Sequence, residues 1–179
     1  MKNINTYINE KLHVTTKSHL YSCQPKTNDE LRKIIIKRIQ DEGNDCDLND
    51  IDVSKITDMS YLFINTDVFK KFNGDISMWD VSNVTNMNWM FCGCEKFNCD
   101  ISDWNVSNVE SMTGIFINCK QFDCDLSGWD ISNVTHMRGM FYNCEKFRQN
   151  LDNWNVSNVK IMGDAFKNCP TQPEWYRNK

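Results

Sequence analysis

Nine cysteines offer this chain its widest choice of chemistry, since thiols form disulfides, bind zinc and act as nucleophiles. Seven of them recur in two columns: Cys94, Cys119, Cys144 and Cys169, and Cys46, Cys99 and Cys124. The odd total argues against a fully paired disulfide framework. We therefore expect both columns to be small, buried apolar side chains in a reducing compartment. Disulfides between neighbouring copies are the alternative, because stacking brings equivalent Cα atoms to about 5 Å.

The spacing of the cysteines, histidines and aspartates does not indicate a metal site or a catalytic site. Cys92-Gly-Cys94 with Cys99 is a poor zinc pattern, because the spacing is unsuitable and no histidine lies near it. The histidines are scattered along the chain: His13, His19 and His136. A carboxylate recurs once per copy: Asp75, Asp100 and Asp125. We interpret it as a capping or solvated group. Since the sequence also lacks a phosphate-binding glycine loop and a nucleophile elbow, we predict no enzyme activity, no cofactor and no metal site.

The cysteine and aspartate columns belong to a sequence repeat of 25 residues. It is most visible in the tryptophans: Trp79, Trp104, Trp129 and Trp154. A methionine column follows: Met87, Met112, Met137 and Met162. A degenerate first copy begins at Cys46, with Ile51 at the tryptophan position and three extra residues near 65–68. We predict five turns: 46–73, 74–98, 99–123, 124–148 and 149–170. A residue that recurs in every turn usually packs in the interior, so we expect the tryptophan and methionine columns in the core.

Each copy is too short to enclose a core, so the copies must stack and bury their apolar columns against one another. Val84, Met87 and Phe91 follow the i, i+3, i+7 spacing of a short helix, with Ser82 and Asn83 placed to cap it. The stacked asparagines could also form a hydrogen-bonded ladder. The preceding Asp-Ile-Ser-x-Trp-Asp-Val run favours a short strand. The predicted fold class is an α/β repeat solenoid, leucine-rich-repeat-like, with a short strand and a short helix in each of five turns.

Both ends of such a stack expose apolar surface and need covers. Thr27-Asn-Asp-Glu30 matches a capping box and precedes an apolar stripe that stops near Gly43, which predicts a helical cap over 28–42. At the other end Pro170 would stop the last helix, and Trp175 and Tyr176 would fold over the final turn.

The N-terminal part of the chain completes the predicted organisation. A second short helix is indicated by four apolar residues: Ile4, Tyr7, Ile8 and Leu12. Residues 13–26 would link it to the cap. The predicted parts of the chain are 1–45, an N-terminal helical segment and cap; 46–170, the repeats; and 171–179, a C-terminal tail.

Charge indicates the kind of partner. The whole chain has a formal net charge of −4, and the repeats carry 17 acidic against 10 basic residues. A nucleic acid requires a clustered basic face, so we expect no direct nucleic-acid contact and instead a protein partner with a basic surface. No apolar stretch is long enough for a membrane span, and the start lacks a secretory h-region. These features predict a cytoplasmic protein, with a surface location only if a leader was removed. The sequence leaves the oligomeric state open.

The repeat resembles the BspA-like leucine-rich repeats, the DUF285 group of surface-protein repeats. The matching residues are Gly74-Asp-Ile-Ser-Met-Trp-Asp-Val-Ser-Asn-Val-Thr-Asn-Met and Met90-Phe91, within about 46–170. The resemblance implies a leucine-rich-repeat-type solenoid with a binding or adhesion role and brings no catalytic residues. Many members are long exported proteins, whereas this chain is short. It is also similar to short leaderless versions, opening with a Tyr-Ile-Asn-Glu-like segment, that phages and mobile elements of gut bacteria encode.

Recognition is expected at the positions where the copies differ, because structural columns must agree from turn to turn. Trp89 is the foremost candidate contact, since it is a lone bulky aromatic in a column otherwise occupied by Gly114, Gly139 and Asp164. Local packing is the alternative role of this side chain. The other candidates come from the most variable columns: Met78, Asp103, Asn153, His136, Arg138 and Asn88.

The predicted function is a non-catalytic protein–protein interaction module that binds a macromolecule through the variable face of the stack. Three more specific roles fit it. A phage-encoded inhibitor would mask a basic host enzyme of a defence system, a virion or scaffold component would self-assemble, and a cell-surface adhesin would require export.

Overall fold

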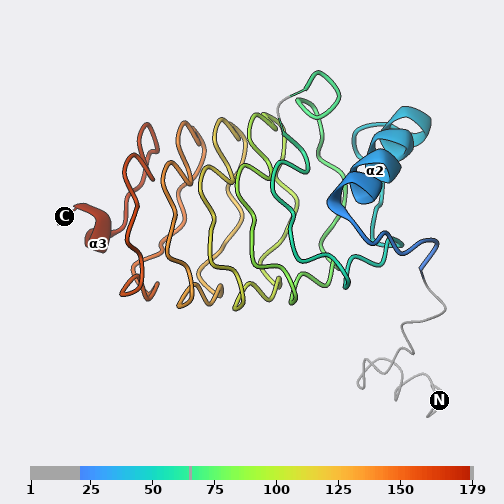
Figure 1. The fold of residues 1–179 in the computed structure, drawn as a ribbon. Coiled ribbons are helices and arrows are strands. Elements are labelled where there is room, and N and C mark those ends of the chain that lie inside the picture. The colour runs from blue at the N-terminus through green and yellow to red at the C-terminus, as the bar shows by residue number, and fades with distance from the viewer. Residues whose placement is uncertain (1–20, 65, 178–179) are drawn as a thin grey trace, which may run out of the picture.

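The computed structural model describes residues 21–64 and 66–177. The chain winds through successive turns that lie side by side, with helix α2 (Asn28–Glu42) at one end and helix α3 (Glu174–Arg177) at the other (Figure 1). These are the only helices of the described residues, which contain no strand. The turns themselves consist of irregular backbone. The predicted α/β solenoid, with a strand and a helix in every turn, is therefore wrong.

Left-handed backbone excludes the expected helix, because it occurs at one place in all five turns and at a second place in the four turns from 74 onward. The first place has φ between 58° and 62°: Tyr61, Trp89, Gly114, Gly139 and Asp164. The second lies four residues further along: Gly93, Asn118, Asn143 and Asn168. An α-helix requires negative φ at every residue. The spacing of Val84, Met87 and Phe91 therefore reflects burial of all three side chains, and Pro170 has no helix to end.

Hydrogen bonds between and within turns explain why no strand forms either. In the segment after the methionine column, Trp89 donates its N–H forward to the carbonyl of Thr113 in the next turn, at 2.8 Å. The N–H of Cys92 instead donates back to the carbonyl of Trp89, at 3.2 Å. Because alternate N–H groups bond within the turn and to the next turn, the segment forms overlapping tight turns that are hydrogen-bonded to the neighbouring turn. Isolated parallel bridges join successive members of one column: Asp58, Asn86, Ser111, His136 and Ile161.

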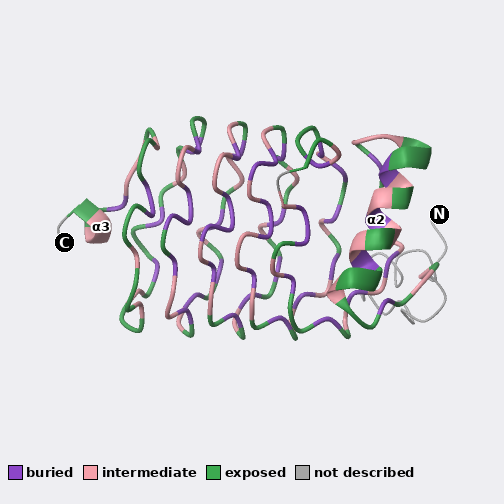
Figure 2. Cartoon of the chain, turned by 45° about the horizontal axis from the view of Figure 1, so that its top comes forward, coloured by how far each residue is buried: buried purple, intermediate pink, exposed green. Residues whose placement is uncertain are grey.

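The core runs through the inside of the stack, where the apolar residues shared by the turns are buried (Figure 2). The four repeat tryptophans expose only 3–4% of their surface, and the rings of Trp79 and Trp104 stack at 6.4 Å. Each indole N–H donates to a carbonyl of the preceding turn; that of Trp104, for example, reaches Ile76 O at 3.2 Å. Met87, Met112 and Met137 are also fully buried. The predicted core columns are confirmed, although Met162 in the last turn is half-buried.

The recurring Asp/Asn-x-Ser pattern, interpreted above as part of a strand, forms Asx turns. The carboxylate of Asp75 accepts hydrogen bonds from the main-chain N–H of Ser77 at 2.9 Å and from its hydroxyl at 2.7 Å. Asp80 and Ser82 repeat this arrangement five residues later. A side chain that bonds the backbone two residues ahead bends the chain locally. Each of these motifs therefore makes a corner.

Asparagines connect the turns in a different way from the one expected. The amide of Asn83 donates to the carbonyl of Ser54 in the preceding turn at 2.9 Å, so Asn83 and Ser82 cap no helix. An amide-to-amide ladder does exist, but in the second left-handed column. There Asn168 donates to Asn143 Oδ1 at 2.6 Å, and Asn143 donates to Asn118 Oδ1 at 2.8 Å.

Helix α2 begins and ends where the sequence predicts. Thr27 is its N-cap and accepts from the N–H of Glu30 at 3.2 Å. The carboxylate of Glu30 accepts from the N–H of Lys26, one residue before the position that a capping box uses. Gly43 follows the helix with φ of 96°. One face of the helix packs into the core through three buried side chains: Leu31, Ile35 and Ile39.

Helix α2 also supplies hydrogen-bond donors to the first turn, which has no turn before it to provide them. Inside the stack, alternate carbonyls accept from the N–H groups of the turn before them. In the first turn Asn28 donates its amide to Asp58 O at 3.1 Å and to Ser60 O at 2.8 Å, and the guanidinium of Arg32 bonds Leu62 O. Helix α2 therefore satisfies this edge of the stack as well as covering its apolar end.

The C-terminal tail covers the other end, as predicted. Trp175 donates its indole N–H to Leu151 O at 2.8 Å, and its ring stacks on Trp154 at 6.5 Å, so it takes the place of a fifth repeat tryptophan. Tyr176 packs on Phe166 at 5.1 Å. The helix expected between Ile4 and Leu12, with most of the 13–26 linker, lies outside the described residues.

Candidate protein-binding surface

Each turn divides into two parts that differ in charge. The Asx half comprises 46–56, 74–84, 99–109, 124–134 and 149–159. The left-handed half comprises 57–73, 85–98, 110–123, 135–148 and 160–170. The Asx half carries ten carboxylates and one lysine, whereas the left-handed half carries seven carboxylates and nine lysines and arginines. The acidity of the repeats therefore belongs to the Asx half.

Three of the predicted contact residues lie on the Asx half: Met78, Asp103 and Asn153. All three are exposed, and Met78 shows 73% of its surface to solvent. Asn153 lies in a polar hollow of about 490 Å³ together with Asp125, Gln149 and Asp152. The column therefore faces outward, as its variability suggests. Its role in binding stays a prediction.

Asx turns favour the charged form of four carboxyls of the Asx half, whose pKa values are lowered: Asp75, Asp100, Asp125 and Asp130. For Asp75 and Asp125 the main cause is the hydrogen bond from the main-chain N–H of the serine two residues ahead. For the other two carboxyls, the hydroxyl of that serine lowers the pKa most. The interpretation of the recurrent carboxylate as a capping group is confirmed, with a turn in place of a helix.

The other four predicted contact residues lie on the left-handed half: Asn88, Trp89, His136 and Arg138. Arg138 is exposed and Trp89 is half-buried. Asn88 is largely committed to the fold, because its carboxamide oxygen accepts from Ser111 Oγ at 2.6 Å and from Thr113 N at 2.8 Å. His136 takes part in the bridged column through its backbone. The structure thus divides the seven predicted residues between the two halves.

Trp89 and Arg138 line one groove on the left-handed half. It measures about 210 Å³ and is bounded by seven residues: Trp89, Thr113, Ile117, Arg138, Gly139, Tyr142 and Asp164. The Trp89 ring lies against Gly114, where an added Cβ would meet Trp89 Cδ2 at 3.1 Å. Trp89 therefore does pack locally against Gly114, and its ring also lines the groove, where a ligand could contact it. The sequence analysis missed Ile117 and Tyr142. Both residues belong to a column that varies between copies and lies three residues after the column of Trp89, and this variability could have identified them.

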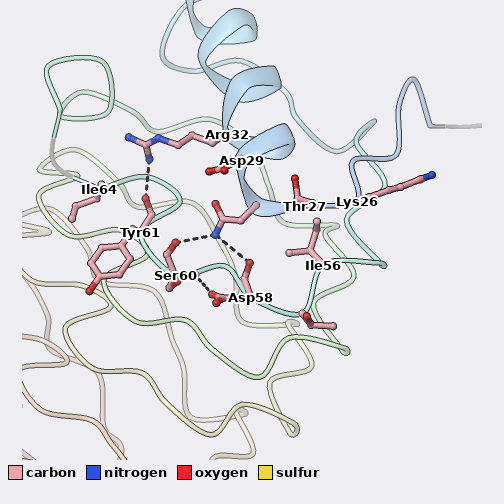
Figure 3. Close-up of a pocket in the computed structure, with 11 residues that line it drawn as sticks. Lys26, Thr27, Asp29, Arg32, Ile56, Asp58, Ser60, Tyr61 and Ile64 are labelled. Carbon is pink, nitrogen blue, oxygen red and sulfur yellow. Dashed lines mark hydrogen bonds between the residues drawn. The ribbon is translucent and has the colours of Figure 1, made fainter.

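A larger polar pocket of about 680 Å³ lies between the start of α2 and the first turn (Figure 3). Lys26, Asp29 and Arg32 contribute to it from the helix side, and Asp58 and Tyr61 from the turn. Arg32 donates to Tyr61 O at 2.8 Å, and its guanidinium lies 4.8 Å from the Phe69 ring centroid. Two of the pocket's polar side chains, Asn28 and Arg32, are thus occupied in closing the end of the stack.

Both cysteine columns consist of free thiols in the structure. Cys94, Cys119 and Cys144 are buried, and each thiol donates to a phenylalanine carbonyl of the preceding turn at 3.1 Å. Burial raises the pKa of the half-exposed Cys99 to about 11 and that of Cys124 to about 12. Within the described residues, no group of three or more metal-ligating side chains converges. No helix there is long and apolar enough to cross a membrane.

Stacked turns that share a buried tryptophan–phenylalanine core define a repeat protein. A family model described as "Mycoplasma protein of unknown function, DUF285" matches residues 33–123 and again 67–175. The chain therefore belongs to the DUF285 family, as the resemblance of its motif indicated. Neither the search of curated proteins nor the search of solved structures returned a match.

Proposed function

We propose that this chain is a non-catalytic protein-binding module and that its partner presents a basic surface to the Asx half. One observation carries the proposal: the apolar columns shared by the turns are buried, while a column that differs from turn to turn is exposed throughout, at Met78, Asp103, Gly128 and Asn153. Surface positions of a repeat stack can change without cost to the shared core. Such positions are suited to recognition.

Charge supports the basic partner. The Asx half carries ten carboxylates, and the pKa values of four are lowered by the Asx turns. Regularly placed negative charges steer an oppositely charged protein and favour its docking. Met78, exposed among these carboxylates, supplies an apolar contact of a type that is enriched in interfaces.

An inhibitor that covers a basic enzyme is the more specific role favoured by this distribution of charge. Enzymes that act on nucleic acids carry basic surfaces of this kind. A module with an acidic, rigidly built face could cover such a surface without chemistry of its own.

A charge-removal experiment tests the proposal. Asp100→Asn, Asp125→Asn and Asp130→Asn together remove three charges, and the Asx turns survive because Asn105, Asn150 and Asn155 make the same turns elsewhere. The control removes three exposed charges from the left-handed half: Asp67→Asn, Glu110→Gln and Glu145→Gln.

The wild-type chain should capture basic proteins from a lysate of the cells that encode it, and the captured amount should fall as salt is added. The Asx-half variant should lose these proteins while the control keeps them. Equal capture by both variants would refute the proposal.

A further inference from the structure

The groove beside Trp89 lies on the left-handed half, so the acidic surface invoked above does not account for it. Its lining is mainly apolar, from Trp89, Ile117 and Tyr142, with Arg138 at its edge. The volume of about 210 Å³ is smaller than the roughly 300–1,000 Å³ of typical small-molecule pockets. A single amino-acid side chain would fit such a space better than a cofactor.

The backbone at Trp89 is left-handed, as it is at Tyr61 and Asp164 in the same column. Its φ is 58°, the left-handed region in which the next two turns carry Gly114 and Gly139. A residue with a side chain pays an energetic penalty in that region, and such outliers concentrate at functional sites. Burial of the ring compensates only in part, because Trp89 stays half exposed.

The composition of the groove matches that of protein-binding hot spots. Tryptophan, tyrosine and arginine are the residues most enriched there, and one of each lines this small space: Trp89, Tyr142 and Arg138. Gly139 forms part of the floor, and an added Cβ there would meet nothing closer than Ile117 Cδ1 at 3.4 Å. The missing side chain keeps the groove open.

The charges around the groove specify the occupant. Asp164 is paired with Lys167 at 3.5 Å, and Lys167 also lies 5.6 Å from the Tyr142 ring centroid. Arg138 is exposed and makes no ion pair with any other described residue. An unpaired guanidinium beside an apolar groove favours a carboxylate next to an apolar side chain.

We propose that this groove binds a segment of a partner protein in which an apolar side chain, such as leucine, is followed by an aspartate or glutamate. The apolar side chain fills the space between Trp89 and Tyr142, and the acidic side chain pairs with Arg138. This site is separate from the acidic Asx half, so a partner could be bound at either place alone.

Short blocked peptides test the chemistry directly. The probe is acetyl-Leu-Glu-amide, and its neutral counterpart is acetyl-Leu-Gln-amide. Binding is followed by ¹H–¹⁵N NMR at the Trp89 indole N–H and at the main-chain N–H groups of Gly139 and Tyr142. We expect shifts at these three groups, with several-fold weaker binding of the neutral peptide.

Three variants distinguish the groove from nonspecific binding. Gly139→Trp should abolish the shifts, because the equivalent place two copies earlier accommodates a tryptophan, Trp89, and a tryptophan at 139 would fill the space. Gly128→Trp is the matched control, since nothing lies within 4 Å of an added Cβ at that position on the Asx half. Arg138→Gln should remove the preference for the acidic peptide while leucine-dependent binding persists.

Several outcomes would overturn the inference. These are equal shifts in the Gly139→Trp protein, equal affinity for both peptides, or binding of acetyl-leucine without binding of acetyl-Leu-Glu-amide, which would indicate a chain terminus instead. The amide spectrum of each variant away from the groove shows whether it folds. Because the Asx-half charge variants leave the groove intact, failure here and failure of the proposed function remain distinguishable.

Discussion

The two halves of each turn solve the same stacking problem by different means. In the Asx half, side chains make the corners, so a turn needs only an oxygen acceptor at its first residue and can use Asp100 or Asn105 alike. In the left-handed half, the backbone makes the corners, so the chain needs residues that tolerate positive φ, such as Gly114 or Asn118. The first solution leaves charge free to accumulate on the surface. The second leaves gaps where glycine stands, and one of these gaps is the Trp89 groove.

The largest expected effect comes from the core that both halves share. Trp104→Ala removes a side chain that is 4% exposed, stacks on Trp79 and bonds Ile76 O. Truncating a buried tryptophan costs about 3–5 kcal/mol of unfolding free energy, to be measured by urea denaturation. Trp89→Gly is the contrasting variant, because it introduces the residue that neighbouring turns already carry. It should cost far less, and an equal loss in both variants would contradict the division between core and surface.

A pair of glycine substitutions compares the two halves directly. Gly114→Ala places a Cβ at φ of 62° and 3.0 Å from Ile117 Cδ1, which should cost about 1–2 kcal/mol of unfolding free energy. Gly128→Ala places its Cβ in open space without left-handed backbone. It should leave stability within about 0.5 kcal/mol of wild type or raise it slightly. Comparable destabilisation by both substitutions would show that the halves do not differ in this way.

Acid should weaken the Asx half specifically. A carboxyl whose folded-state pKa is lowered stabilises the fold at pH values above its unfolded pKa of about 3.9, and this contribution is lost as pH falls through the folded pKa. We therefore expect unfolding free energy to decline below about pH 4. The triple variant Asp100→Asn, Asp125→Asn and Asp130→Asn should decline less, measured by denaturation at several pH values. If wild type and variant had identical pH profiles of unfolding free energy, groups other than these three carboxyls would cause the acid sensitivity.

Thiol reactivity gives the smallest and most local comparison. The pKa values of Cys99 and Cys124, raised by burial to about 11 and 12, leave little thiolate at pH 8. Alkylation at these two sites, followed by peptide mass spectrometry, should rise about tenfold per pH unit while the protein stays folded. Cys119, which is fully buried, should react only after unfolding. Rapid alkylation of Cys119 in the folded protein would contradict the packing of its column.

The sequence predicted well those features that depend on repetition and on helix ends. Any side chain that recurs in every turn must fit against its own copies, so the burial of Trp104 or Met112 followed from spacing alone. The helix over 28–42 carried its own signals in Thr27 and Gly43. Two of the residues that line the Trp89 groove, Trp89 and Arg138, were contact candidates because their columns vary between copies, whereas the groove itself was not predicted and the adjoining Tyr142 was overlooked.

Backbone conformation within the turns was the part predicted wrongly, and the reason is physical. Burial at i, i+3 and i+7 is shared by a helix and by stacked tight turns, so the spacing of Val84, Met87 and Phe91 could not separate them. Gly114 and Asn118, four residues apart, could have indicated the left-handed corners, because both residue types tolerate positive φ.

By itself the sequence determined which residues repeat, which columns form the core and where one cap lies, since these follow from copies packing on copies. Only the tertiary structure decided which N–H and carbonyl groups bond between turns, because those partners lie some 25 residues away in the neighbouring turn. That choice sets the left-handed corners. The corners in turn bring Trp89, Ile117 and Tyr142 from three different copies to one groove.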